Sequence, residues 1–343
     1  MSETLTAPTI AQIEAMRQII RPHVMHTPLV PFAGVETDNN GRLHLKLENL
    51  QWTGAFKNRP AAALLHSTPR EALASGVCTA SSGNFGIALS ALASQLGIAA
   101  TVIVPDTAHT GKLERLRRTG ARVVQVSHEE WWQTILTHQC GDGNGTYLDA
   151  VADTRAMAGN GSIGLEILEQ LPDVDTVFVP FGGGGLLCGI AAAIKAIRPE
   201  VRIVGCESEL ATPLAAAFRA GRAVTVPCHA GFISGIGAES VLPRMWPLLQ
   251  RFVDAAVVVS LPDTVSALRA MLLQGHVLAE GAGAVSVAAA RTGQVRGRNM
   301  VCVVSGGNIG ANVLASILAG EIPQGLVGHA ERAVIGPDSR ESG

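Results

Sequence analysis

The segment "DTVFVPFGGGGLLCGIAAAIKAI", residues 175–197, contains the pattern that decides the fold. A short apolar run ends in four consecutive glycines, and an alanine-rich apolar segment follows. Such an order is typical of a buried strand, a tight loop and a helix. Glycine lets the backbone approach a ligand closely, and the start of a helix offers free N–H groups. We therefore expect residues 182–185 to bind a phosphate group.

The same strand–loop–helix order recurs along the chain. It is found in "GVCTASSGNFGIALSALASQLG", in "AATVIVPDTAHTGKLERLRRTG" and in "MVCVVSGGNIGANVLASILA", with further short strands at 121–127 and 201–209. Short apolar runs that alternate with helices predict βαβ units and parallel sheets. We also expect a helix over 10–20, capped by Thr9, a half-buried strand within 41–50 and a helix after Lys57.

We divide the chain into two α/β domains by this pattern. Residues 1–50 and 146–325 form the expected large domain, residues 51–145 the small one, and residues 326–343 a flexible tail. The length of 343 residues suits two domains of ordinary size.

Composition excludes several classes of protein. Hydrophobic residues make up 47% of the chain, charged residues 16%, and the net charge is −2. No basic stripe indicates nucleic acid, and no apolar run reaches the ~18 residues that span a bilayer. Six cysteines, at 78, 140, 188, 206, 228 and 302, show no zinc-ligand spacing and are expected to be small buried side chains. Together with the absence of a signal peptide, this predicts a reducing, cytoplasmic setting.

Two further loops have the composition of anion sites at strand ends. Ser81-Ser82-Gly83-Asn84 and Ser305-Gly306-Gly307-Asn308 offer hydroxyl and amide groups besides backbone N–H groups. We expect the first to hold a carboxylate. The glycines at 182–185 do not fit the P-loop pattern or the dinucleotide fingerprint, which argues against both ligands.

Lys57 lies in "WTGAFKNRPA", residues 52–61, an otherwise apolar and glycine-containing stretch. Taken in order along the chain, "TGAFKNRPA", "SSGNFG", "GGGG", "EGAGA" and "SGGN" resemble the motifs of fold-type II pyridoxal-phosphate enzymes. The sequence is most similar to the serine/threonine dehydratase and serine racemase group, over residues 9–320. That resemblance implies the tryptophan synthase β-like fold, with the cofactor between two open parallel-sheet domains.

The resemblance also implies roles for individual residues. Lys57 matches the Schiff-base lysine, and Gly182, Gly183, Gly184 and Gly185 with Leu186 match the phosphate cup. Asn84 matches the partner of the cofactor's O3′, and Ser305 the partner of its ring nitrogen. The loop Ser81, Ser82, Gly83 and Asn84 matches the site of the substrate carboxylate. Ser82 aligns with the second acid/base group of serine racemases.

The activity implied is β-elimination from a β-hydroxy amino acid such as L-threonine or L-serine. A neutral hydroxyl at the ring nitrogen makes the cofactor a weaker electron sink, which favours elimination over transamination. Lys57, with a pKa lowered by burial, is the expected general base. The products are a 2-oxo acid and ammonia. As in relatives, a homodimer is expected, with no membrane or nucleic-acid partner.

Several positions depart from the family pattern. Phe85 stands where His is frequent, Asp149-Ala150-Val151 where His-Pro-Asn is frequent, and Ser234 where Asp is frequent. A larger substrate such as hydroxyaspartate, phenylserine or an ectoine-derived amino acid is therefore an alternative. The divalent-cation site of relatives matches at Glu207 and Ala211 but not at Pro213, which has no side-chain oxygen, so no metal is expected. A serine racemase, or an anion-binding protein without catalysis, is also compatible with these residues.

Overall fold

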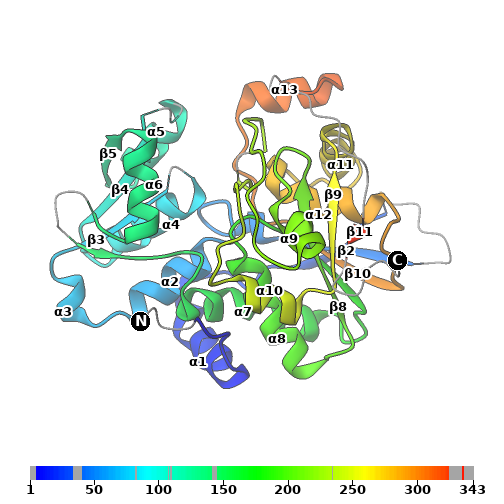
Figure 1. The fold of residues 1–343 in the computed structure, drawn as a ribbon, viewed down its shortest axis with the longest axis horizontal. Helices are drawn as coiled ribbons and strands as arrows, with labels where there is room; N and C mark the ends of the chain where they lie inside the picture. The colour runs from blue at the N-terminus through cyan, green and yellow to red at the C-terminus, as the bar shows by residue number, and fades with distance from the viewer. Residues whose placement is uncertain are drawn as a thin grey trace.

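The structure is a computed structural model that describes residues 5–33, 41–81, 83–106, 108, 110–140, 145–233, 235–323 and 334–335. Two sheets dominate it, one of seven strands and one of four, and Figure 1 shows the smaller sheet with its helices to one side of the larger. The expected α/β architecture with two open, mainly parallel sheets is thereby confirmed.

The larger sheet has the strand order β1-β2-β10-β7-β8-β9-β11. Its strands are β1 Leu29–Pro31, β2 Arg42–Lys46, β7 Thr176–Pro180, β8 Arg202–Ser208, β9 Ala255–Val259, β10 Asn299–Val303 and β11 Val334–Ile335. The pairs from β2 to β9 are parallel, while β1 and β11 join the edges antiparallel. The strand over 42–46 was expected, whereas β9 was not among the predicted strands.

Helices cover both faces of the larger sheet, which explains why its central strands are apolar throughout. Val177 and Val179 of β7 face one core, and Phe178 faces the other. On the first face lie α1 Ile10–Ile20, α2 Asn58–Ser67, α7 Thr154–Gln170, α8 Gly185–Ile197 and α10 Trp246–Phe252. On the second lie α11 Leu261–Leu273, α12 Gly281–Arg291 and α13 Ala311–Ala319.

The four-stranded sheet is wholly parallel, with the order β5-β4-β3-β6. Its elements are β3 Val77–Ala80, α4 Asn84–Gln95, β4 Ala100–Pro105, α5 Thr110–Arg118, β5 Arg122–Val126, α6 His128–Thr137 and β6 Thr146–Tyr147. Leu64 and Leu65 of α2 share a core with Leu89 and Leu92 of α4. This shared core packs against both sheets, so it does not separate the chain into two units at residues 50 and 145. The domain boundaries therefore stay a prediction.

The helix over 10–20 forms as predicted, and Thr9 caps it in a reciprocal capping box with Gln12. The helix after Lys57 is α2, and its residues 58–65 are all buried. Short helices complete the fold: η1 Arg21–His23, η3 Glu48–Leu50, α3 Arg70–Leu73 and α9 Pro213–Ala220. Of the expected flexible tail, only Val334–Ile335 is among the described residues, and it pairs with β9.

The cysteines correct one expectation. Cys78 of β3 and Cys140, just after α6, form a disulfide, with their Cα atoms 6.4 Å apart. Cys228 is exposed, while Cys188, Cys206 and Cys302 are buried thiols as expected. The sequence spacing gave no signal for the disulfide, because the packing of α6 against β3 and β4 brings the two residues together. No helix of the described residues is long and apolar enough to cross a membrane.

Candidate active site

Lys57 immediately precedes α2, on a segment that is attached to the loop after β10. Phe56 N donates to Ser305 O over 2.9 Å, and Ala55 forms an antiparallel bridge with Gly306. Gly54 has a φ of +79°, and an added Cβ would lie 2.3 Å from Asn308 Oδ1. These contacts bring the lysine segment next to Ser305, although the two are far apart in the sequence.

A buried ionic network fixes the first turn of α2. Arg59, fully buried, donates to both oxygens of Glu48 over 2.8 Å each and to both oxygens of Glu166 over 2.7 and 2.9 Å. Lys46 Nζ lies 2.6 Å from Glu166 Oε2. The two cations therefore balance two carboxylates, as buried charges require. The network ties α2, and with it Lys57, to β2 and α7.

The four glycines connect the end of β7 to α8, as predicted. Gly184 has a φ of +96°, a conformation that favours glycine. An added Cβ would lie 2.6 Å from Val151 Cγ1 at Gly183 and 2.7 Å from Val151 O at Gly185. The loop is thus packed tightly on Val151, and Gly185 and Leu186, the first residues of α8, border the pocket. The first N–H groups of a helix have no partner within the helix. A phosphate group suits this site, since helix starts attract anions.

The loop after β3 leads directly into α4. Ser81 Oγ accepts hydrogen bonds from Gly83 N over 3.4 Å and from Gly86 N over 3.3 Å, and so organises the turn. Asn84 is the first residue of α4. Ser82, expected to be a catalytic and substrate-binding residue, lies outside the described residues, and so does Ser234.

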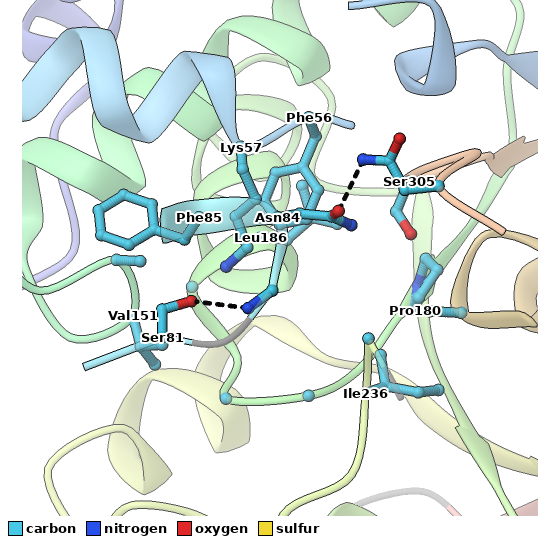
Figure 2. A pocket seen from close by; sticks show the side chains of 18 of the residues that line it. Phe56, Lys57, Ser81, Asn84, Phe85, Val151, Pro180, Leu186, Ile236 and Ser305 are labelled. Carbon is cyan, nitrogen blue, oxygen red and sulfur yellow. Dashed lines mark hydrogen bonds between the residues drawn. The ribbon is translucent and has the colours of Figure 1, made fainter. Parts of the chain in front are cut away.

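A chain of side-chain amides crosses the site. Asn84 Nδ2 donates to Glu280 Oε1 over 2.7 Å, and Asn84 Oδ1 accepts from Asn308 Nδ2 over 2.7 Å. Glu280 precedes α12, and Asn308 lies in the loop after β10. Ser305, only 5% exposed, lies at the start of that loop. Hydroxyl, amide and carboxylate groups therefore line the cavity that Lys57 enters. Figure 2 shows Asn84 beside Lys57, with Ser305 across from them.

These groups line one cavity of about 250 Å³. All the described residues that we predicted for the site border it: Lys57, Ser81, Gly83, Asn84, Gly182, Gly183, Gly184, Gly185, Leu186 and Ser305. Figure 2 shows Ser305 and Pro180 on one side and Phe85, Ser81 and Val151 on the other.

Sequence reasoning assigned no site role to several residues that line this cavity: Phe56, Arg115, Pro180 and Ile236. Pro180 lies at the end of β7, a position where ligands bind in parallel sheets, and that signal was available. Arg115 gave none, because only the tertiary fold brings the middle of α5 to the cavity.

The cavity alters the acidity of its groups. Loss of hydration lowers the pKa of Lys57 to about 8, although the carboxylates of Asp149 and Glu280 oppose the shift. Burial raises the pKa of the Asp149 carboxyl, but hydrogen bonds from His138 and from Val151 N, together with the charge of Arg244, outweigh it. The net result is a lowered pKa, so Asp149 is ionised near the amine. Lys57 is thus partly neutral near neutral pH.

Glu207, the first residue of the expected cation motif, is fully enclosed at the end of β8. Its Oε1 accepts from Leu214 N over 2.7 Å and its Oε2 from Ala215 N over 2.9 Å, at the start of α9. Burial raises the pKa of its carboxyl to about 8. Across the described part of the chain no group of three His, Cys, Asp or Glu side chains is placed to hold a metal ion. The absence of a metal stays a prediction.

Comparisons with known proteins agree with this geometry. A family model described as "pyridoxal-phosphate dependent enzyme" matches residues 20–306. An L-threonine ammonia-lyase of Thermotoga maritima is 34% identical over 331 residues, 95% of this chain and 81% of that enzyme. One from Geobacter sulfurreducens is 38% identical over 83% of this chain and 71% of its own. Maize serine racemase superposes with a TM-score of 0.84 at 29% identity, over 92% of this chain and 98% of that one.

Proposed function

The chain belongs to the family of pyridoxal-phosphate dependent enzymes, and we propose that it is an ammonia-lyase acting on a β-hydroxy amino acid such as L-threonine or L-serine. The observation that carries the proposal is the cavity in which Lys57 meets a glycine-lined helix start, a Ser-Gly-Asn loop and a buried serine. The threonine ammonia-lyases that match most of the chain support the same reaction. Pyridoxal phosphate is the cofactor.

The residues of the cavity fit this cofactor. The N–H groups at residues 182–186 suit its phosphate, the Asn84 amide suits its ring oxygen, and the Ser305 hydroxyl suits its ring nitrogen. The aromatic rings of Phe56 and Phe85 lie 4.8 and 5.8 Å from Lys57 Nζ and hold the amine in a water-poor setting. When bound, pyridoxal phosphate supplies a sink for the electron pair left at Cα by proton removal.

Lys57 is the proposed base. Its pKa of about 8 makes the neutral amine far more abundant than for an ordinary lysine, and the neutral form is able to accept the Cα proton of the substrate. The Ser81–Asn84 loop would orient the substrate carboxylate. The β-hydroxyl departs with a proton as water, and the resulting enamine takes up water to give the 2-oxo acid and ammonia. Ser305, a neutral hydroxyl, would leave the ring nitrogen of the bound cofactor without a counter-ion, so the electron sink would be weaker, which favours loss of the β-hydroxyl together with the Cα proton.

A second candidate is the same elimination from a larger β-hydroxy amino acid. The side chains of Phe85 and Val151 give the cavity an apolar wall on one side, and Ile236 lies on the opposite side (Figure 2). An apolar wall favours a larger side chain than that of serine, because it buries more apolar surface.

The test is a panel of β-hydroxy amino acids, with ammonia release followed for each. We expect turnover of at least one member and none with Lys57→Ala, whose visible absorbance with added cofactor should also be lost. Turnover retained by Lys57→Ala would refute the assignment. Formation of D-serine from L-serine at the rate of pyruvate formation would instead support a racemase.

Three further properties are proposals. The boundaries of the two domains, a homodimeric state and a cytoplasmic location all follow the pattern expected for relatives. Light scattering of the purified protein tests the dimer. The cytoplasmic proposal implies that Cys78 and Cys140, which the structure pairs, are mostly reduced in the cell. A count of thiols in the denatured, unreduced protein tests it, since four free thiols indicate the disulfide and six its absence.

A further inference from the structure

Arg115 reaches from the four-stranded sheet to the loop after β10. It lies on α5 and lines the cavity, and its Nη2 donates to Asn308 Oδ1 over 2.6 Å. In the part of the chain that the structure describes, this amide is its hydrogen-bonding partner, and no carboxylate forms an ion pair with it. The charged guanidinium therefore binds a neutral amide in the cavity. We ask what this contact does for the site.

Asn308 links Arg115 to Asn84 through hydrogen bonds. Its Nδ2 donates to Thr53 O over 2.8 Å and to Asn84 Oδ1 over 2.7 Å. Asn84 Nδ2 then donates to Glu280 Oε1 over 2.7 Å. The four side chains thus form one hydrogen-bonded line from Arg115 to Glu280, and each contact is short.

Arg115 and the carbonyl oxygen of Thr53 fix the direction of this line. Arginine only donates, whereas a backbone carbonyl oxygen only accepts. Asn308 must therefore turn Oδ1 to Arg115 and Nδ2 to Thr53 and Asn84, so Asn84 accepts through Oδ1 and turns Nδ2 toward Glu280. One Nδ2 hydrogen of Asn84 serves Glu280, and the second is left for a ligand oxygen in the cavity.

We propose that Asn308, held by Arg115, is a positioning residue that sets the orientation of the Asn84 amide and so presents an N–H to the cofactor's ring oxygen. The proposal rests on the function given above. Reversal of the Asn84 amide would place its oxygen against the carboxylate of Glu280 and against the ring oxygen. Reversal of the Asn308 amide would place its oxygen against Asn84 Oδ1 and Thr53 O, and so would favour that reversal of Asn84. A mispaired buried polar contact of this kind weakens binding about 10- to 100-fold.

The deciding variant is Asn308→Asp, compared with Asn308→Ala. An aspartate at position 308 would keep the tie to Arg115, as an ion pair, but would present an acceptor to Thr53 O and to Asn84 Oδ1. We expect Asn308→Asp to weaken cofactor binding by the apoenzyme at least as much as Asn308→Ala, about 10-fold or more. We also expect it to shift the pH dependence of the bound cofactor's visible absorbance. Wild-type affinity and absorbance in Asn308→Asp would overturn the proposal, because they would show that the contact only ties the two sheets together.

A second pair of variants avoids a folding problem at position 308. Arg115 is half-exposed on α5, so Arg115→Gln and Arg115→Glu are both expected to fold. Gln is able to donate to Asn308 and Glu is not, so Gln should keep the cofactor affinity within about 3-fold and Glu should lower it about 10-fold. Equal affinities for the pair would also contradict the proposal.

Two controls separate the possible failures. Arg118→Met removes a cation from the same helix at an exposed position, 4.0 Å from Glu114, and should change neither affinity nor absorbance. Wild-type protein that binds no pyridoxal phosphate and releases no ammonia from any β-hydroxy amino acid would refute the proposed function itself. An active wild type with an equally competent Asn308→Asp variant would refute only the positioning role.

Discussion

Replacement of Arg59 by methionine is expected to lower the free energy of unfolding by about 3–5 kcal/mol, because it leaves buried carboxylates uncompensated. The guanidinium is fully buried and donates to Glu48, Glu166 and Ser162, the last over 2.8 Å. With Arg59 and Lys46 opposite two glutamates, the network is neutral, and the substitution leaves one net negative charge in the core. Methionine retains much of the volume, so a cavity adds little to this cost.

The matched control is Arg17→Met. Arg17 also pairs with a glutamate, Glu169, but the two side chains are 29% and 51% exposed. An exposed pair contributes about 0–1 kcal/mol, so this variant should unfold almost as the wild type does. Urea unfolding of both apoenzymes, followed by circular dichroism, measures the difference. A loss in Arg59→Met no larger than in Arg17→Met would refute the reasoning.

The pH dependence gives a second check on the same variant. Burial raises the pKa of Glu166, but the charges of Arg59 and Lys46 outweigh it and hold that pKa below its usual range. The stabilisation from this group is present above the unfolded pKa and is lost as pH falls through the folded value. The deficit of Arg59→Met should therefore be largest at neutral pH and should shrink on acidification. A deficit independent of pH would point to packing and not to charge.

Three further outcomes are expected. Gly185→Ala should destabilise the apoenzyme by about 1–3 kcal/mol, because its Cβ meets the backbone of Val151 at 2.7 Å. Gly182→Ala, 3.5 Å from Ile236 Cα, should not, and equal melting of the two would contradict this. The rate of cofactor uptake by the apoenzyme should rise with pH and level off above about 8, as Lys57 becomes neutral; a flat profile would speak against a shifted lysine. Burial raises the pKa of Glu207 to about 8, so its stabilisation is complete below about 4.5 and is lost as pH rises through 8. Glu207→Gln should remove that decline from the unfolding free energy, and an unchanged slope would exclude Glu207 as its source.

Much of the fold could be predicted from local sequence. Thr9 and the apolar spacing of residues 10–20 specify α1, and the glycines at 182–185 mark the β7–α8 turn, because these signals act within a few residues. The site residues at strand ends were predictable for the same reason, since parallel strands bring their carboxyl ends to one edge.

The remaining parts of the site depend on contacts that no local pattern encodes. Val151 contacts Gly183 and Gly185 only because the segment between β6 and α7 packs against the glycine loop. Arg115 reaches the cavity through the packing of α5, and Cys78 meets Cys140 across two intervening βα units. Such tertiary neighbours leave no periodicity in the sequence, so reasoning from the chain alone passed over them.

The backbone hydrogen bond from Phe56 to Ser305 has a consequence for biosynthesis. A nascent chain that has emerged only as far as α7 carries Lys57 and the Ser81–Asn84 loop, but it lacks the glycine cup and Ser305. The site is completed only when β10 and its loop have left the ribosome, so capture of the cofactor comes late in synthesis. Until β10 emerges, β2 lacks its parallel partner, and the apolar side chains of Leu43 and Leu45 lack part of the core in which they are buried. Exposed apolar surface makes a folding intermediate prone to aggregation, so we expect chaperone binding to matter most in that interval.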